Sequence, residues 1–176
     1  MDKKDFKLYN MILPPFMLFA FVPMLWLISL IGNFIIDSIV LILLVLIFYK
    51  RMNWQFYKNL ILKIWVLGFV ADILGVVYLL SVSLGANAEY SESNDLGKQI
   101  LSGIYLATNQ SHFDSFWGVM FILSGIFVSS AFIFIFNYFI VFQNTDMIKK
   151  QKLLFALCLA ILTAPYTFLL PWNLFY

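Results

Sequence analysis

The stretch GFVADILGVVY, residues 68–78, decides the fold class because every residue in it suits a lipid-buried helix except Asp72. It lies inside an apolar run, residues 59–83, that is long enough to cross a bilayer, which takes about 20 residues. An aspartate at the centre of a spanning helix costs about 2.5–3.5 kcal/mol on insertion scales. Asp72 therefore requires a hydrogen-bond partner, a proton or a bound cation.

The composition is that of an integral membrane protein. Of the 176 residues, 63% are hydrophobic and 11% are charged, whereas soluble domains have roughly 45–50% apolar and about 25% charged residues. We predict one all-α, membrane-embedded domain over residues 1–176. The net charge of +2 does not indicate nucleic-acid binding, and the single cysteine, Cys158, excludes an internal disulfide. No cofactor and no metal site are expected.

Five apolar runs predict five transmembrane helices, with a tight turn at Gly32 and Asn33 between the first two. Ten of the 11 basic residues fall on one side of this threading. The positive-inside rule then places the N-terminus in the cytoplasm and the C-terminus outside. All but one of the basic residues are lysines, a bias typical of low-GC bacteria, so we expect a bacterial cytoplasmic membrane. The predicted runs are residues 11–31, 34–49, 59–83, 115–141 and 153–172.

The one sizeable outer loop covers residues 84–114. Within it, Leu96, Ile100 and Ile104 recur at helical spacing and predict an interfacial helix over residues 95–106. The alternative is a loop folded over the ends of the spanning helices, and the sequence leaves both open.

A second acid, Asp37, lies in the predicted second span. No Lys or Arg falls in the outer half of any span, so neither acid has a cation within the chain. Asn33 and Ser38 lie close to Asp37 in sequence and would add oxygen ligands of the kind that hard cations prefer. We predict an ion, proton or buried polar site from Asp72, Asp37, Asn33 and Ser38. Two plainer interpretations stay open, a protonated Asp72 bonded across helices and an Asp37 solvated in the outer hairpin.

Small residues predict a close contact between the third and fourth spans, because they let two helices approach each other. They also turn the Asp72 side of its helix towards protein. Pro165 interrupts the fifth run, where proline bends a helix, although proline is also common in membrane helices. The predicted packing residues are Gly68, Ala71 and Gly75 on the third span, and Gly118, Gly125 and Ser129 on the fourth.

Three functions follow from these features. The first is cation- or proton-linked transport, or a channel-type role, that uses the buried acids. The second is a non-catalytic accessory, assembly or protective subunit that binds another membrane protein. The third, an intramembrane aspartyl hydrolase, is disfavoured because neither FIIDS nor VADILG matches a GxGD pattern. We predict no catalytic residues, and we expect a homo-oligomer or partner membrane subunits in the lipid bilayer.

Overall fold

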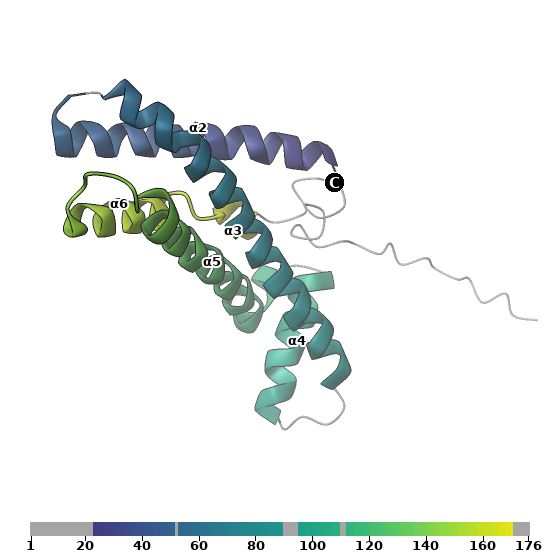
Figure 1. Ribbon diagram of the computed structural model, residues 1–176. Coiled ribbons are helices and arrows are strands. Elements are labelled where there is room, and N and C mark those ends of the chain that lie inside the picture. Colours follow the sequence, from purple (N-terminus) through teal and green to yellow (C-terminus); the bar gives the residue numbers. More distant parts are fainter. Residues whose placement is uncertain (1–22, 52, 90–94, 110–111, 171–176) are drawn as a thin grey trace, which may run out of the picture.

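The computed structural model describes residues 23–51, 53–89, 95–109 and 112–170, and every element within them is helical (Figure 1). Four segments are long and apolar enough to cross a membrane: Leu30–Tyr49, Trp54–Ala86, Phe116–Val141 and Lys149–Leu169. The elements are α2 (Pro23–Tyr49), α3 (Trp54–Glu89), α4 (Asp95–Asn109), η1 (His112–Asp114), α5 (Phe116–Phe136), the π-helical turn η2 (Asn137–Val141), α6 (Lys149–Leu162) and η3 (Tyr166–Leu169).

The predicted turn between the first two spans is wrong. Helix α2 runs without interruption through Gly32 and Asn33, so the end of the predicted run 11–31 and the whole of 34–49 form one helix. Glycine costs only about 1 kcal/mol in a helix, whereas a bilayer offers no substitute partner for a broken backbone hydrogen bond. Residues 11–22 lie outside the described residues, so the fifth crossing stays a prediction.

The predicted fifth span, 153–172, is broken in the structure. Helix α6 ends at Leu162, and η3 resumes at Tyr166 after a short non-helical segment. Pro165 lacks the N–H group that would continue the helix, and it disfavours helical backbone at the residue before it. The break therefore follows from one proline, and it leaves Thr163 at the end of α6.

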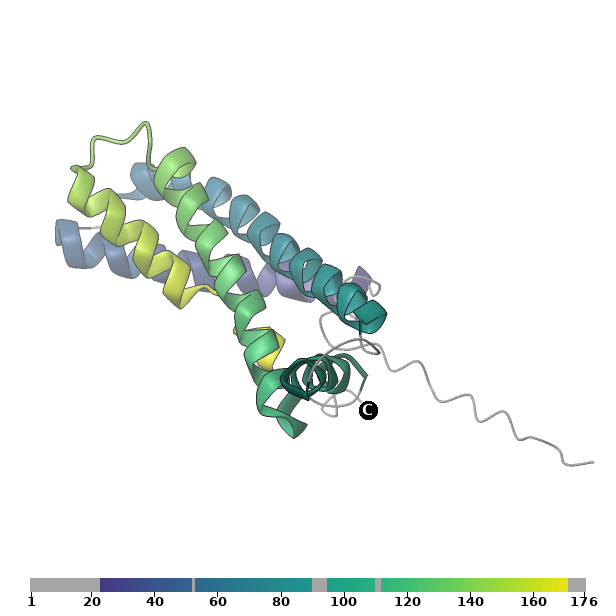
Figure 2. The ribbon, with the colours of Figure 1, turned by 90° about the horizontal axis from the view of Figure 1, so that it is seen from below.

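Helices α3 and α5 pack against each other along much of their length and form the central pair of the structure. Figures 1 and 2 show them side by side, with α2 and α6 packed near the end where the α2–α3 and η2–α6 connections lie. At about 1.5 Å per residue, the 36 residues of α3 extend roughly 54 Å, well beyond a hydrocarbon core of about 30 Å. Its far end packs against α4.

Helix α4 packs on the far ends of α3 and α5, as in the alternative of a segment folded over the ends of the spanning helices. Its position at a membrane interface stays a prediction. The helix is three residues longer than the range 95–106, and it packs on the ends of two spanning helices. Ile104 and Ala107 are buried in this contact, while Leu96 and Tyr105 stay exposed.

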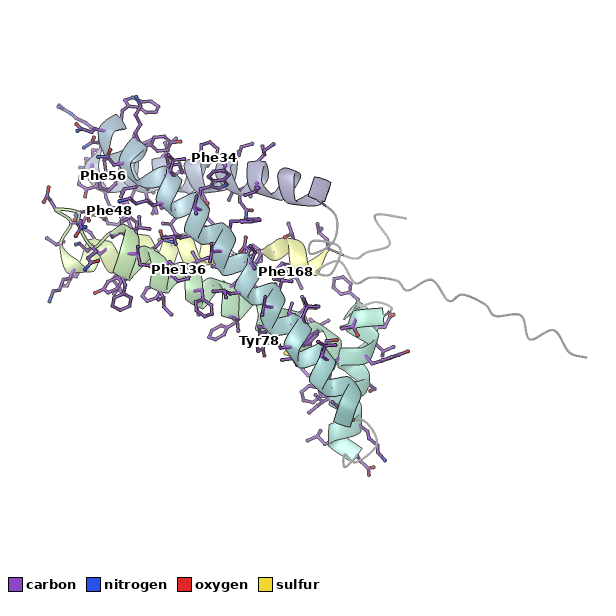
Figure 3. All side chains as sticks on the ribbon, turned by 45° about the vertical axis from the view of Figure 1, so that its right-hand side comes forward. Phe34, Phe48, Phe56, Tyr78, Phe136 and Phe168 are labelled. Atoms are coloured by element: carbon purple, nitrogen blue, oxygen red, sulfur yellow. The ribbon has the colours of Figure 1, made fainter. Side chains whose placement is uncertain are left out.

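Buried apolar side chains form two separate clusters. The first core lies around α2, η2 and α6 and includes Leu41, Ile64, Ile133, Phe155 and Leu159. The second core lies around α4, the C-terminal half of α3 and the N-terminal half of α5, and includes Leu79, Ile104, Ile122, Ala164 and Phe168. In Figure 3, Phe34, Phe48, Phe56 and Phe136 mark the surroundings of the first core, and Tyr78 and Phe168 mark the second.

Candidate polar site between the two cores

A layer of polar residues lies where the two apolar cores meet. On α3, Asp72 follows Ala71 of the first core and precedes Leu79 of the second. Ser129 and Thr163 occupy the corresponding places on the other elements, Ser129 between Ile126 and Ile133, and Thr163 between Ala160 and Ala164. Helix α2 contributes the last two members. We call this set the polar layer: Asn33, Asp37, Asp72, Ser129 and Thr163.

Asp72 is held by a hydrogen bond from the neighbouring helix. The side-chain nitrogen of Asn33 on α2 donates to Asp72 Oδ2 at 2.8 Å. The sequence suggested an oxygen ligand at Asn33, but the amide nitrogen is the group that faces the acid. The other carboxyl oxygen, Asp72 Oδ1, is buried and has no hydrogen-bond partner. An unsatisfied buried polar atom costs about 1–3 kcal/mol, so this oxygen is available to a proton, a water molecule or a cation.

Asp37 is buried one helical turn further along α2, with only 3% of its surface exposed. Its carboxyl packs against Gly68 of α3, where an added Cβ would lie 3.6 Å from Asp37 Oδ2. It also lies near enough to interact electrostatically with Asp72. The structure therefore brings together two acids that are 35 positions apart, 72 minus 37, in the sequence.

Thr163, at the break after α6, is the third partner of the acids. Its hydroxyl lies within hydrogen-bonding reach of the Asp37 carboxyl and is also 2.9 Å from the Leu159 carbonyl oxygen. A hydroxyl has one proton to donate. When that proton goes to Leu159, Thr163 accepts a hydrogen bond from a protonated Asp37. When it goes to Asp37, the carboxyl is the acceptor. The pair can therefore accommodate either protonation state of Asp37.

Ser38 has a different partner from the one its place in the sequence suggested. Its hydroxyl is buried and accepts a hydrogen bond of 3.1 Å from Tyr57, near the start of α3. The structure thus gives Ser38 a role in joining α2 to α3. A further hydrogen bond, from the Trp65 indole nitrogen to the Leu30 carbonyl oxygen at 2.8 Å, joins the same two helices.

The small residues lie at three different contacts. Gly75 faces Ser129 and the Gly125 carbonyl oxygen across the α3–α5 interface, and Gly125 in turn packs against Leu79. Gly68 faces Asp37 on α2. Gly118 lies against Gly103 of α4, and Ala71 is fully buried in the first core. Close approach of α3 and α5 thus rests on Gly75, Gly125 and Ser129.

Ser129 brings a second unsatisfied oxygen to the layer. Its side chain is fully buried, and its Oγ has no hydrogen-bond partner. It contacts Gly75, which is three residues from Asp72 and hence on the same side of α3. A further buried oxygen without a partner, Asn137 Oδ1, lies in η2, where the Asn137 amide nitrogen donates to the Ile133 carbonyl oxygen at 2.8 Å.

No cation of the described chain neutralises the acids. The side chains that act on the two carboxyls are those of Asn33, Thr163 and the other acid. Within the described ranges, no group of three or more His, Cys, Asp and Glu residues could hold a metal ion. The arrangement can exchange a proton between two carboxyls, a hydroxyl and any water that enters the layer.

Sequence reasoning identified Asn33, Asp37 and Asp72 but missed Thr163. The sequence did contain a pattern that could have indicated Thr163. It lies two residues before Pro165, where the helix is expected to end. Ser129 was predicted as a packing residue only. Its place against Gly75, three residues from Asp72, depends on the register of α5 against α3, which the sequence does not reveal.

The fold defines a class: an all-helical chain, over its described residues, with four helices long and apolar enough to span a membrane. Comparison with known proteins takes the identification no further, because no family model, no curated protein and no solved structure matches the chain.

Proposed function

We propose that this protein serves proton-linked transport, or a channel-type role, in a bacterial cytoplasmic membrane, with Asp37 and Asp72 as the groups that bind the proton. The observation that supports this most directly is the state of Asp72. One of its oxygens accepts a hydrogen bond from Asn33, the other is buried without a partner, and a second acid lies close by. Ionisable groups at such depth commonly mark proton or ion pathways.

A proton fits the polar layer better than a metal ion does. Calcium takes six to eight oxygen ligands, and Asn33 presents an N–H group, which repels a cation, to one of the acids. The break after α6 does not supply a free carbonyl oxygen as a metal ligand. Pro165 has no N–H group to donate to the Ile161 carbonyl oxygen, but this oxygen accepts a hydrogen bond of 2.6 Å from the Tyr166 hydroxyl instead. Few free oxygens remain for a bound metal.

The distribution of basic residues supports one orientation. The positive-inside rule would place the end with the α2–α3 and η2–α6 connections in the cytoplasm (Figure 1), and α4, which carries Lys98, outside. The cytoplasmic N-terminus stays a prediction, because it depends on residues 1–22. The basic residues at the proposed inner end are Lys50, Arg51, Lys58, Lys63, Lys149, Lys150 and Lys152.

The alternative, a non-catalytic accessory subunit, draws less support from the structure. That function would need small-residue surfaces free to receive a partner helix. Here Gly75, Gly125 and Ser129 are already in contact within the chain, and Gly118 lies against α4. Oligomers and partner subunits remain compatible with transport, and they stay predictions.

The test is proton flux in liposomes that contain the purified protein and an internal pH-sensitive dye. An imposed pH gradient, with potassium and valinomycin to compensate charge, should collapse faster than in empty liposomes. Asp72→Asn and Asp37→Asn should each slow the flux at least about tenfold, the factor that corresponds to about 1.4 kcal/mol of barrier. The matched control is Asp114→Asn, which removes an exposed acid near the start of α5.

Two results contradict the proposal. One is wild-type protein that moves protons no faster than empty liposomes. The other is a folded Asp72→Asn or Asp37→Asn variant with wild-type flux. A flux that requires a sodium gradient and is insensitive to the pH gradient would move the assignment from a proton to a monovalent cation.

A further inference from the structure

A second site, independent of the polar layer, lies at the basic end of the molecule. The end of α2, the start of α3 and the segment between η2 and α6 line an open pocket of about 560 Å³. Ligand sites typically have volumes of roughly 300–1,000 Å³, so this pocket is large enough for a small polar group. Its polar lining comes from the start of α3 and from the η2–α6 segment: Asn53, Asn59, Lys63, Asn144, Thr145 and Asp146.

Lys63 is the cation that lines this pocket. It lies nine residues after Trp54, the first residue of α3, and thus about 13 Å along the helix at 1.5 Å per residue. Lys58 lies nearer the helix start; both lysines are exposed, but Lys58 does not line the pocket. On a spanning helix, the long side chain of Lys63 would extend its ammonium toward the lipid headgroups.

The amides around Lys63 supply donors for an anion. Asn53 accepts a hydrogen bond from the Phe56 backbone N–H through its side-chain oxygen at 3.0 Å, which leaves its NH₂ group free to donate elsewhere. Asn59 and Asn144 add further amide donors, whereas the single hydroxyl proton of Thr145 is already donated to the Phe142 carbonyl oxygen at 2.8 Å. This set suits the several oxygens of a phosphate.

The wider field at this end is positive despite one acid in the lining. Asp146 lies two residues before Ile148, the residue that caps the start of α6, where a negative charge stabilises the positive end of the helix dipole. The chain carries six further basic residues in the α2–α3 connection, near the start of α3 and in the first turn of α6: Lys50, Arg51, Lys58, Lys149, Lys150 and Lys152.

We infer that this pocket binds the phosphate of an anionic phospholipid headgroup, with Lys63 as its charged ligand and the surrounding amides as hydrogen-bond donors. Basic pockets between transmembrane helices on the cytoplasmic side are suited to such headgroups. The pocket opens at the ends of the spanning helices, so a lipid would enter with its acyl chains still in the bilayer. This inference does not depend on proton transport.

Native mass spectrometry of the detergent-purified protein tests the site, with phosphatidylglycerol added against phosphatidylcholine. Wild-type protein should retain phosphatidylglycerol preferentially. Lys63→Gln should weaken that binding about tenfold, as expected for loss of a charge-assisted hydrogen bond. Lys63→Arg should largely preserve it. Lys58→Gln makes the same charge change on the same helix outside the pocket, and it should alter binding less than about threefold.

The outcomes separate the site from simpler explanations. Equal weakening by Lys63→Gln and Lys58→Gln would assign lipid binding to the general positive field and overturn the pocket. No preference for phosphatidylglycerol over phosphatidylcholine would overturn it as well. If millimolar inorganic phosphate displaces phosphatidylglycerol from the wild type, the site recognises free phosphate and the lipid assignment is wrong. Retention of phosphatidylglycerol in the presence of phosphate supports the lipid.

Discussion

The amide nitrogen of Asn33 lies 2.8 Å from Asp72 Oδ2 and joins two helices across 39 positions of sequence. This bond fixes α2 against α3 at the level where the two apolar cores meet. It also sets Asp37 beside Gly68, one turn further along α2. Asn33, which the sequence predicted to lie in a turn, therefore lies within a helix and positions Asp72.

Removal of the Asn33 amide should destabilise the protein through Asp72. Asn33→Leu leaves both carboxyl oxygens of a buried acid without a partner, which costs about 1–3 kcal/mol of unfolding free energy. Asn144→Leu, at an exposed position in the η2–α6 connection, should change stability by less than about 0.5 kcal/mol. Unfolding in mixed detergent micelles measures both variants.

The double variant Asn33→Leu with Asp72→Leu tests whether Asn33 and Asp72 interact in the folded protein. Because replacing both partners with apolar groups leaves no buried polar atom unpaired, the double variant should be more stable than Asn33→Leu alone. A stability equal to the sum of the two single effects would show that the two residues do not interact.

Thr163 should influence proton flux through its hydroxyl rather than its shape. Thr163→Val keeps the volume but removes the group within reach of Asp37, so flux should fall at least about tenfold. Thr163→Ser retains the hydroxyl and should keep flux within about threefold of the wild type. The liposome assay compares them, and equal loss in both variants would assign Thr163 a packing role only.

The α3–α5 contact should tolerate no Cβ at Gly75. An added Cβ would overlap Ser129 Oγ and lie 3.1 Å from the Gly125 carbonyl oxygen, so Gly75→Ala should cost about 1–3 kcal/mol. Gly85 lies on the same helix with nothing within 4 Å of the added atom. Gly85→Ala should be neutral or stabilise by up to about 1 kcal/mol. Similar melting temperatures for the two variants would contradict the close contact.

The proposed orientation can be measured with single cysteines. In a Cys158→Ala background, Lys150→Cys at the start of α6 and Lys98→Cys on α4 are both exposed. A membrane-impermeant maleimide should label Lys98→Cys in intact cells and Lys150→Cys only after the membrane is opened. The reverse pattern would refute the cytoplasmic assignment of the basic end.

Two of the five predicted runs match helices closely, as expected for apolar runs that must satisfy their own backbone hydrogen bonds in lipid. The runs 59–83 and 115–141 lie within α3 and within α5 with η2, apart from the single residue Ser115. The turn predicted at Gly32 and Asn33 was wrong because these residue types favour turns in water, whereas in lipid an unbroken helix keeps every backbone hydrogen bond. The break near Pro165 was visible as a proline, but its consequence for Thr163 was not.

The sequence by itself indicated a helical chain with runs apolar enough to span a membrane, and two acids within those runs that have no lysine or arginine within two helical turns along the chain. Hydropathy and charge are properties of each residue and its neighbours along the chain, so they can be read directly. Only the tertiary structure decided that Asp37, Asp72, Asn33, Ser129 and Thr163 form one layer between two cores. That grouping depends on how four separate helical segments are rotated and staggered, which is set by packing at contacts such as Gly75 against Ser129.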